Sequence, residues 1–101
     1  MFLEPINRYE INFINTMEEG YRFIEKVAED NLLLLIDTFH MNIEEPSTTQ
    51  SIKNFGSLIG HIHIADSNRK APGLGHIDFL SIIAQLMKIN YRSFLSAEII
   101  P

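Results

Sequence analysis

Four ionisable side chains, Glu4, Asp37, His63 and Glu98, fall in four separate β-like runs of the chain. Three carboxylates packed together repel one another where water is scarce, and a divalent cation removes that cost. Three oxygen ligands and one imidazole suit a fairly hard ion such as Mn²⁺, Co²⁺ or Mg²⁺, whereas zinc usually prefers more nitrogen or sulfur. If the four side chains converge, the sequence therefore predicts a divalent metal site.

The β-like runs that carry these residues alternate with helix-like segments. The runs are Phe2 to Ile6, Leu32 to Asp37, Ile59 to Ala65 and Phe94 to Ile99. Apolar spacing predicts helices over Met17 to Glu29, more weakly over Thr48 to Phe55, and over Phe79 to Met87, with a polar loop before the second helix. Thr16 and Glu19 are spaced as a capping box for the first helix. This alternation predicts an α/β fold with a parallel sheet and right-handed crossovers.

Strand alternation predicts which way the ionisable groups point. Successive side chains of a strand lie on opposite faces, so each run can direct one ionisable group away from the helices. In the third run the residues predicted to share that face are Ile59, His61, His63 and Ala65. Asp37, His63 and Glu98 fall near the carboxyl ends of their runs, where parallel α/β folds build their sites, whereas Glu4 falls in mid-strand.

An alternative interpretation takes each residue alone. Asp37 at a strand end is commonly a helix cap or turn former, and a single His63 is commonly a core histidine with its hydrogen bonds satisfied. Glu4 and Glu98 are then exposed carboxylates near the chain ends. The case for a metal site depends on the coincidence of one such group per strand, all on one face.

Composition limits the class of protein. The chain has 101 residues, 46% of them hydrophobic, enough for one small folded domain. Its longest apolar run, Leu32 to Ile36, is too short to cross a bilayer, and the N-terminus lacks the pattern of a secretory signal. The absence of cysteine excludes disulfides and fits a cytoplasmic location. A formal charge of −5 without a basic stripe argues against a nucleic-acid partner.

Four segments resemble one known family, the D-tagatose and D-psicose (allulose) 3-epimerases of the xylose isomerase-like TIM-barrel enzymes. The segments are LEPINRYE, IDTFHMNIEE, GHIHIADSNRKAPGLGHIDF and SAEIIP, in the right order and with compatible spacings. The resemblance implies an α/β fold in which residues 1–101 form a single partial domain. That domain would be the C-terminal half, strands five to eight, of a (β/α)8 TIM barrel.

The resemblance also implies a metal-dependent ketose 3-epimerase and a set of metal ligands. The family's ligands match Glu4, Asp37, His63 and Glu98, the set that strand alternation selects. Mn²⁺ is the expected ion, with Co²⁺ or Mg²⁺ as alternatives. Glu4 and Glu98 match the acid/base pair that removes and returns the proton at C3 of the ketose through an enediolate.

Other motif positions match residues that contact the sugar in this family. These are Glu10 in NRYE, His40 in DTFH and Arg69 in SNR. Each of them, taken alone, would be a surface or loop residue. His61, one pleat deeper than His63, is expected to face the barrel interior or to orient a ligand, and not to bind the metal.

Several alternatives stay open at this point. Another enzyme of the superfamily, of the hydroxypyruvate isomerase or inosose dehydratase type, would share the metal carboxylates. An endonuclease IV-like enzyme would need more histidines and a basic face. A barrel needs about 250 residues, so the chain is expected to be a truncated product, a fragment, or a half-barrel that associates, as a homo-oligomer or otherwise, to complete the barrel. A catalytically silent association module or a decayed remnant is the remaining possibility.

Overall fold

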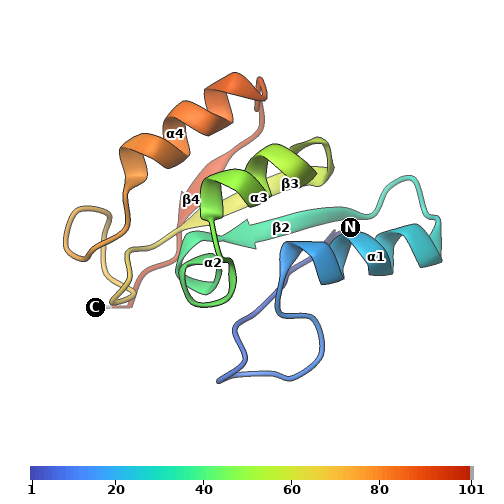
Figure 1. Cartoon of the computed structure of the whole chain (residues 1–101), viewed down its shortest axis with the longest axis horizontal. Coiled ribbons are helices and arrows are strands. Elements are labelled where there is room, and N and C mark those ends of the chain that lie inside the picture. The colour runs from blue at the N-terminus through green and yellow to red at the C-terminus, as the bar shows by residue number, and fades with distance from the viewer. Residues whose placement is uncertain (101) are drawn as a thin grey trace.

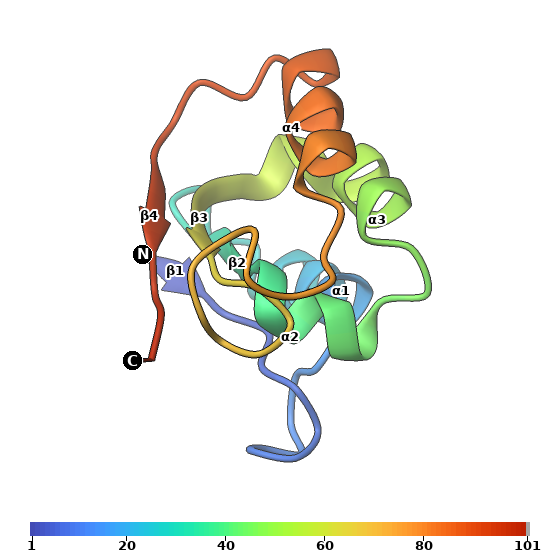
Figure 2. The ribbon, with the colours of Figure 1, turned by 90° about the vertical axis from the view of Figure 1, so that its left-hand side faces the viewer.

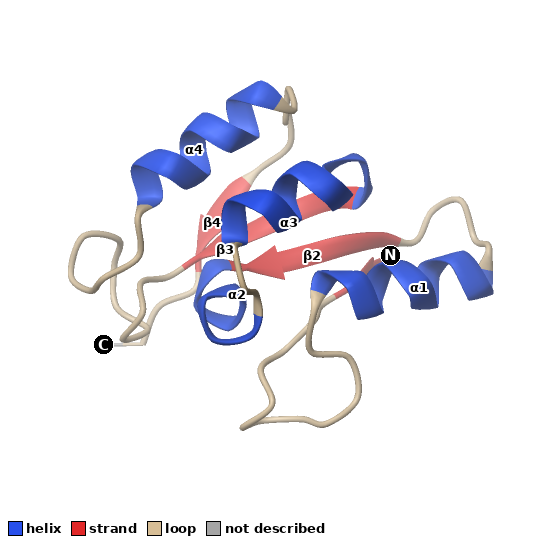
Figure 3. Cartoon of the chain, viewed as in Figure 1, coloured by secondary structure: helices blue, strands red, loops and turns tan. Residues whose placement is uncertain are grey.

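A four-stranded parallel sheet forms the frame of the molecule. The computed structural model describes residues 1–100, and the strands pair in the order β1 (Phe2–Leu3), β2 (Leu33–Asp37), β3 (Ile59–Ile64) and β4 (Leu95–Ala97) (Figure 1). The helices are α1 (Met17–Val27), α2 (Thr38–Glu44), α3 (Thr48–Phe55) and α4 (Phe79–Lys88), with a 3₁₀ turn, η1, at Gly56–Leu58 (Figure 3). The predicted α/β alternation with a parallel sheet is therefore confirmed.

The helices α1, α3 and α4 cover one face of the sheet, as Figure 2 shows. The core lies between these layers, where Leu34, Ile36 and Ile62 of the sheet and Met17 and Ile52 of the helices are all at most 1% exposed. Burial of such side chains is the main favourable contribution to folding. Each helix among residues 1–100 is too short or too polar to reach across a lipid bilayer.

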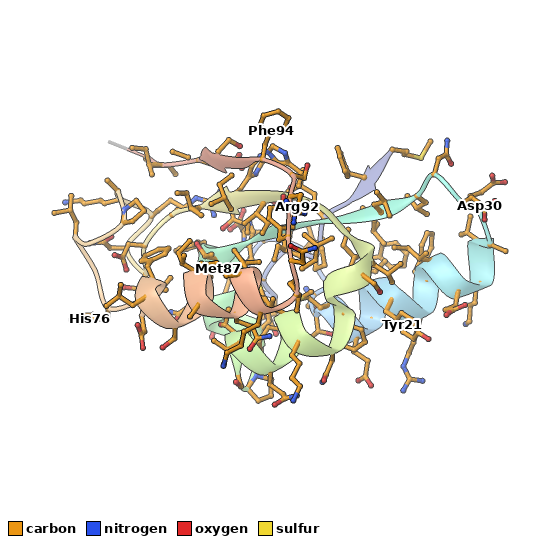
Figure 4. The ribbon with its side chains drawn as sticks, turned by 90° about the horizontal axis from the view of Figure 1, so that it is seen from above. Tyr21, Asp30, His76, Met87, Arg92 and Phe94 are labelled. Carbon is orange, nitrogen blue, oxygen red and sulfur yellow. The ribbon has the colours of Figure 1, made fainter. Side chains whose placement is uncertain are left out.

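The opposite face of the sheet is bare of helices within residues 1–100. Leu33 and Leu35 point to this face and are only partly buried, so the apolar run of β2 is fully buried on the helix side alone. Figure 4 shows Phe94 directed away from the helix layer that carries Tyr21 and Met87. Phe94 is 77% exposed. This face would line the interior of a closed barrel.

A register shift in the sheet corrects one prediction. Ile59 pairs with Leu34 but His61 pairs with Leu35, so Gly60 is an extra residue in β3. Because of this irregularity Ile59 lies in the helix-side core and does not share a face with His61, contrary to the alternation argument. Such bulges re-aim side chains next to functional sites. After the shift, Asp37 pairs with His63, which places the two side chains on neighbouring strands and on one face.

Element boundaries also differ from the sequence prediction, and one helix is additional. The first strand ends at Leu3, so Glu4 follows the strand and is not in its middle. The first helix keeps its predicted Thr16–Glu19 capping box but ends at Val27, because Ala28 adopts a left-handed φ of 56°. The helix α2 was not predicted. It exists because the Asp37 side chain accepts the backbone N–H groups of Phe39 and His40 at its start.

Candidate metal and sugar site

The four predicted metal ligands meet at the carboxyl ends of the strands. Glu4 directly follows β1, Asp37 is the last residue of β2, His63 precedes the last residue of β3, and Glu98 directly follows β4. One ligand atom from each residue can be chosen so that all four atoms lie within 4.8 Å of one another. Loops and strands far apart in the chain thus bring together the donor set that a hard divalent ion prefers.

The polar atoms of this cluster are incompletely satisfied by the protein itself. Asp37 is fully buried, and its Oδ1 caps α2, but its Oδ2 accepts no hydrogen bond. His63 Nδ1 lies against the Glu98 carboxylate and is 3.9 Å from Glu4 Oε2, yet it also has no hydrogen bond of good geometry. Buried polar atoms without partners are rare and mark places where an ion or ligand fits.

The negative charges of the three carboxylates in this cluster also favour a bound cation. Burial raises the pKa of Glu4, and the nearby charges of Asp37 and Glu98 raise it further. Burial also raises the pKa of Asp37, although Arg69 and His40 partly oppose this. A positive ion among the three carboxylates would relieve both the repulsion and the cost of burial. The residues present therefore fit a divalent metal ion.

The three predicted sugar contacts surround this cluster. Arg69 extends from the loop after β3, with its Nη2 3.5 Å from Asp37 Oδ2 and 4.0 Å from Glu98 Oε1, and its guanidinium lies 4.6 Å from the centre of the Phe39 ring. His40 is buried in the first turn of α2, and its Nε2 is 3.4 Å from Arg69 Nη1. Burial lowers the pKa of His40, which favours the neutral ring. Glu10 lies behind it, with Oε2 3.9 Å from His40 Nδ1.

His61 lies deeper in the sheet than the metal cluster. Its Nε2 is 2.8 Å from Ser96 Oγ, and its ring packs edge-on against the His63 ring at a centroid distance of 5.2 Å. His61 is not among the residues whose atoms converge on the cluster. The structure therefore places it beside His63, where it limits how the His63 ring can turn.

Two buried residues near the site were not singled out by sequence reasoning. Asn7 is 1% exposed and contacts both Glu10 and His40. Asp66, also fully buried, accepts the backbone N–H groups of Ser67, Gly73 and Ile77 at 2.7, 2.7 and 3.0 Å. Both lie inside the motif segments, and their only sequence signal is a short polar residue directly after a predicted β-like run, which is equally typical of any turn.

The Asp66 carboxylate organises the loop that carries Arg69. Burial disfavours its ionised form, but the N–H groups of Ile77, Ser67 and Gly73 outweigh this and lower its pKa to about 2. The Asp66 backbone carbonyl accepts the Arg69 N–H at 2.9 Å, and Arg69 adopts a left-handed φ of 67°. The loop is thus held from inside in the conformation that aims the guanidinium at the cluster.

The neighbouring motif residues Arg8 and Asn68 have structural contacts. Arg8 pairs with the Glu44 carboxylate through Nε and Nη2, each at 3.0 Å, which ties the loop after β1 to α2. Asn68 Nδ2 donates to the Leu74 carbonyl at 2.7 Å within its own loop. Gly73 has a φ of 100°, so the PGLG segment is a turn that requires glycine at this position.

TIM-barrel enzymes build their active sites at the carboxyl ends of their strands, and this sheet gathers three carboxylates and a histidine at that edge. The family comparison agrees with this class. The chain belongs to the family described as xylose isomerase-like TIM barrel, whose model matches residues 1–101.

Several relatives that the chain matches are named as sugar epimerases, and one, 34% identical over 107 residues, is named as a putative hydroxypyruvate isomerase of Xenopus laevis. The chain is 43% identical over 96 residues to a D-psicose 3-epimerase of Ruminiclostridium cellulolyticum, covering 95% of this chain and 33% of the relative. It is 38% identical over 98 residues to a 3-dehydro-D-guloside 4-epimerase of Escherichia coli K12, covering 97% and 37%. A solved structure of L-ribulose 3-epimerase superposes with a TM-score of 0.95 at 43% identity, covering 98% and 33%. The chain thus spans about a third of the length of these relatives.

Proposed function

We propose that the chain is the metal-binding and catalytic part of a ketose 3-epimerase, formed by the C-terminal half, strands five to eight, of its TIM barrel. Residues 1–101 are then a single partial domain. The observation that carries this proposal is the convergence of Glu4, Asp37, His63 and Glu98 beside Arg69 and His40. The D-psicose 3-epimerase and the 3-dehydro-D-guloside 4-epimerase, 43% and 38% identical to this chain, support the same reaction class.

In this proposal the four converging residues hold a divalent ion, with Mn²⁺ favoured over Co²⁺ and Mg²⁺ by analogy with the family. When bound, the ion supplies positive charge that polarises the ketose oxygens and lowers the pKa of the C3 proton. The carboxylates at the two ends of the sheet, Glu4 and Glu98, take the proton from one face of the sugar and return it to the other.

The surrounding residues bind and orient the sugar. Arg69 and His40 lie side by side with their nitrogen atoms 3.4 Å apart, so they can share a sugar oxygen that gains negative charge as the enediolate forms. The aromatic ring of Phe39 holds the Arg69 guanidinium from behind. Glu10 reaches His40 only at 3.9 Å, and its half-exposed carboxylate is suited to bind a sugar hydroxyl.

The bare face of the sheet supports an association that completes the barrel. Phe2 and Phe94 are 49% and 77% exposed there, and isolated sheets seldom leave large apolar side chains and strand edges in water. A second half-barrel, from another copy or from a complementary chain, would cover them. Size-exclusion chromatography with and without Mn²⁺ measures this, and a strictly monomeric chain would contradict it.

The direct test is conversion of D-fructose to D-psicose with added Mn²⁺. Glu98→Gln removes one acid/base group and is expected to reduce kcat by about 10²- to 10⁴-fold. Glu29→Gln, an exposed residue in the loop after α1, serves as the matched control and should keep full activity. An active wild-type chain whose Glu98→Gln variant keeps pace would show that the acid/base assignment is wrong.

The substrate class needs a parallel assay. Because one relative is a 4-epimerase of a keto sugar, a 3-keto-glycoside should be tested beside D-fructose. If only the keto-glycoside is converted, the proposed metal site and proton transfer stand, but the substrate is a keto-glycoside and not a ketose.

A further inference from the structure

Asn7 is a buried polar residue in the turn after β1, outside the proposed ligands and sugar contacts. Its Nδ2 donates to Glu10 Oε2 at 2.8 Å, and its Oδ1 accepts the Tyr9 backbone N–H at 2.9 Å. An acceptor on one side and a donor on the other fix which end of the amide is nitrogen. The orientation of the Asn7 side chain is therefore determined by its neighbours.

The amide nitrogen of Asn7 also faces the His40 ring. Nδ2 lies 2.8 Å from His40 Nδ1, and the Asn7 backbone N–H donates to the same ring nitrogen at 3.3 Å. A ring nitrogen that receives two N–H donors must present its lone pair and carries no proton. A neutral imidazole then has its proton on Nε2.

The other ring nitrogen, His40 Nε2, lies 3.4 Å from Arg69 Nη1. With the proton on Nε2, both atoms are donors, and the longer distance agrees with two donors that share no acceptor. Two adjacent donors without an acceptor form a site for an oxygen atom that carries negative charge.

We infer that Asn7 is a positioning residue that holds His40 in the Nε2-protonated tautomer, so that Nε2–H and the Arg69 guanidinium donate together to one oxygen of the bound sugar. The identity of that oxygen as a ketose oxygen rests on the proposed function. The tautomer itself is a property of this chain and is measurable without any reaction. Hydrogen-bond partners of this kind commonly fix the orientation of functional histidines.

The test is the nitrogen spectrum of His40 in the ¹⁵N-labelled chain at about pH 8, where an ordinary histidine is neutral. His40 is assigned by comparison with His40→Gln. We expect the wild type to show an unprotonated Nδ1 and a protonated Nε2. In Asn7→Asp the side-chain donor at 2.8 Å becomes a charged acceptor, which outweighs the backbone N–H at 3.3 Å, so the proton is expected to move to Nδ1. Asn12→Asp adds the same charge at an exposed position of the same loop and should leave the tautomer unchanged.

Two outcomes would overturn the inference. A proton on Nδ1 of His40 in the wild type contradicts the assignment of Nδ1 as the acceptor of the Asn7 N–H groups. An Nε2-protonated ring that is unchanged in both Asn7→Asp and Asn7→Ala shows that the Asn7 side chain does not control it. Asn7→Ala serves where a buried carboxylate prevents folding, because it removes the side-chain donor without adding charge and leaves only the backbone N–H at 3.3 Å.

Activity separates this inference from the proposed function. In a chain that converts D-fructose, Asn7→Asp is expected to lower kcat by about 10- to 100-fold with a smaller change in KM. The reason is that His40 loses its Nε2–H, the donor to the sugar oxygen on which negative charge develops. If no preparation converts any sugar while the tautomer follows Asn7 as expected, the proposed function fails and the positioning role of Asn7 stands.

Discussion

Two aspartates of this molecule, Asp37 and Asp66, are equally buried but lie in opposite environments. Both are 0% exposed and both lie at or just beyond the carboxyl end of a strand. The pKa of Asp37 is raised, chiefly by burial, whereas that of Asp66 is lowered to about 2. Burial alone therefore does not decide what a carboxylate does, and the difference must come from what each one contacts.

The contacts explain the difference. Asp66 receives three backbone N–H groups through both of its oxygens, so its charge is satisfied by its own loop. Asp37 uses one oxygen to cap α2 and leaves Oδ2 without a hydrogen bond, with Glu4 and Glu98 close by. The first carboxylate is complete within the protein. The second lies 3.5 Å from Arg69 Nη2 but accepts no hydrogen bond at Oδ2, and in the proposed function a divalent cation completes it.

The strongest test of this contrast is Asp37→Asn, which keeps a side chain that can cap α2 but removes the charge. In the wild type, Mn²⁺ at about 100 times its Kd should add about 2.7 kcal/mol to the free energy of unfolding. The variant should lose this gain and, without metal, be more stable than the wild type at neutral pH, because a buried charge with a raised pKa is gone. Urea unfolding with and without MnCl₂ measures both.

Asp30→Asn, at an exposed position, is the matched control for Asp37→Asn and should keep the full response to Mn²⁺. An Asp37→Asn variant that responds to Mn²⁺ as the wild type does would remove Asp37 from the ligand set and break the comparison.

Asp66→Asn tests the other half of the comparison. The amide places an NH₂ group against backbone donors, so at least one buried N–H loses its acceptor, at a cost of about 1–3 kcal/mol. The loss of stability should be the same with and without Mn²⁺, since Asp66 accepts N–H groups of its own loop and is not among the proposed metal ligands. Urea midpoints measure the cost, and faster proteolysis after Arg69 or Lys70 would show the loosened loop. An unchanged midpoint would mean that the loop does not depend on the carboxylate.

The sequence predicted the convergence of the four candidate metal ligands better than the strand register and the contacts that support them. One ionisable group per strand could be identified from alternation, since that rule depends only on backbone geometry. The rule failed at Ile59, because the extra residue Gly60 changes the register, and a bulge leaves little trace in a single sequence. The roles of Glu4, Glu10, His40, Arg69 and Glu98 in the reaction stay predictions.

The supporting residues could not be predicted for a related reason. Asn7 donates to a ring nitrogen of His40, and Asp66 accepts backbone N–H groups. Such contacts depend on the path of a loop and not on residue spacing. The helix α2 was missed because a seven-residue helix shows little periodicity, and its start depends on Asp37, which alternation had already assigned to the metal.

The smallest expected effect is the pH dependence that Asp66 contributes to stability. Its folded-state pKa of about 2 lies below the ordinary value of 3.8, so its contribution is fully present above about pH 4 and is lost as the pH falls toward 2. The stability difference between the wild type and Asp66→Asn should therefore be constant above this window and shrink within it. Urea unfolding of both proteins between about pH 6 and pH 2 measures the difference.

Asp30→Asn, at an exposed position in the loop after α1, supplies the control for this titration. Its unfolding midpoint should match that of the wild type at neutral pH. If Asp66→Asn also matched the wild type across the whole pH range, the two buried aspartates would no longer differ in the way their contacts require, and only the metal would distinguish Asp37.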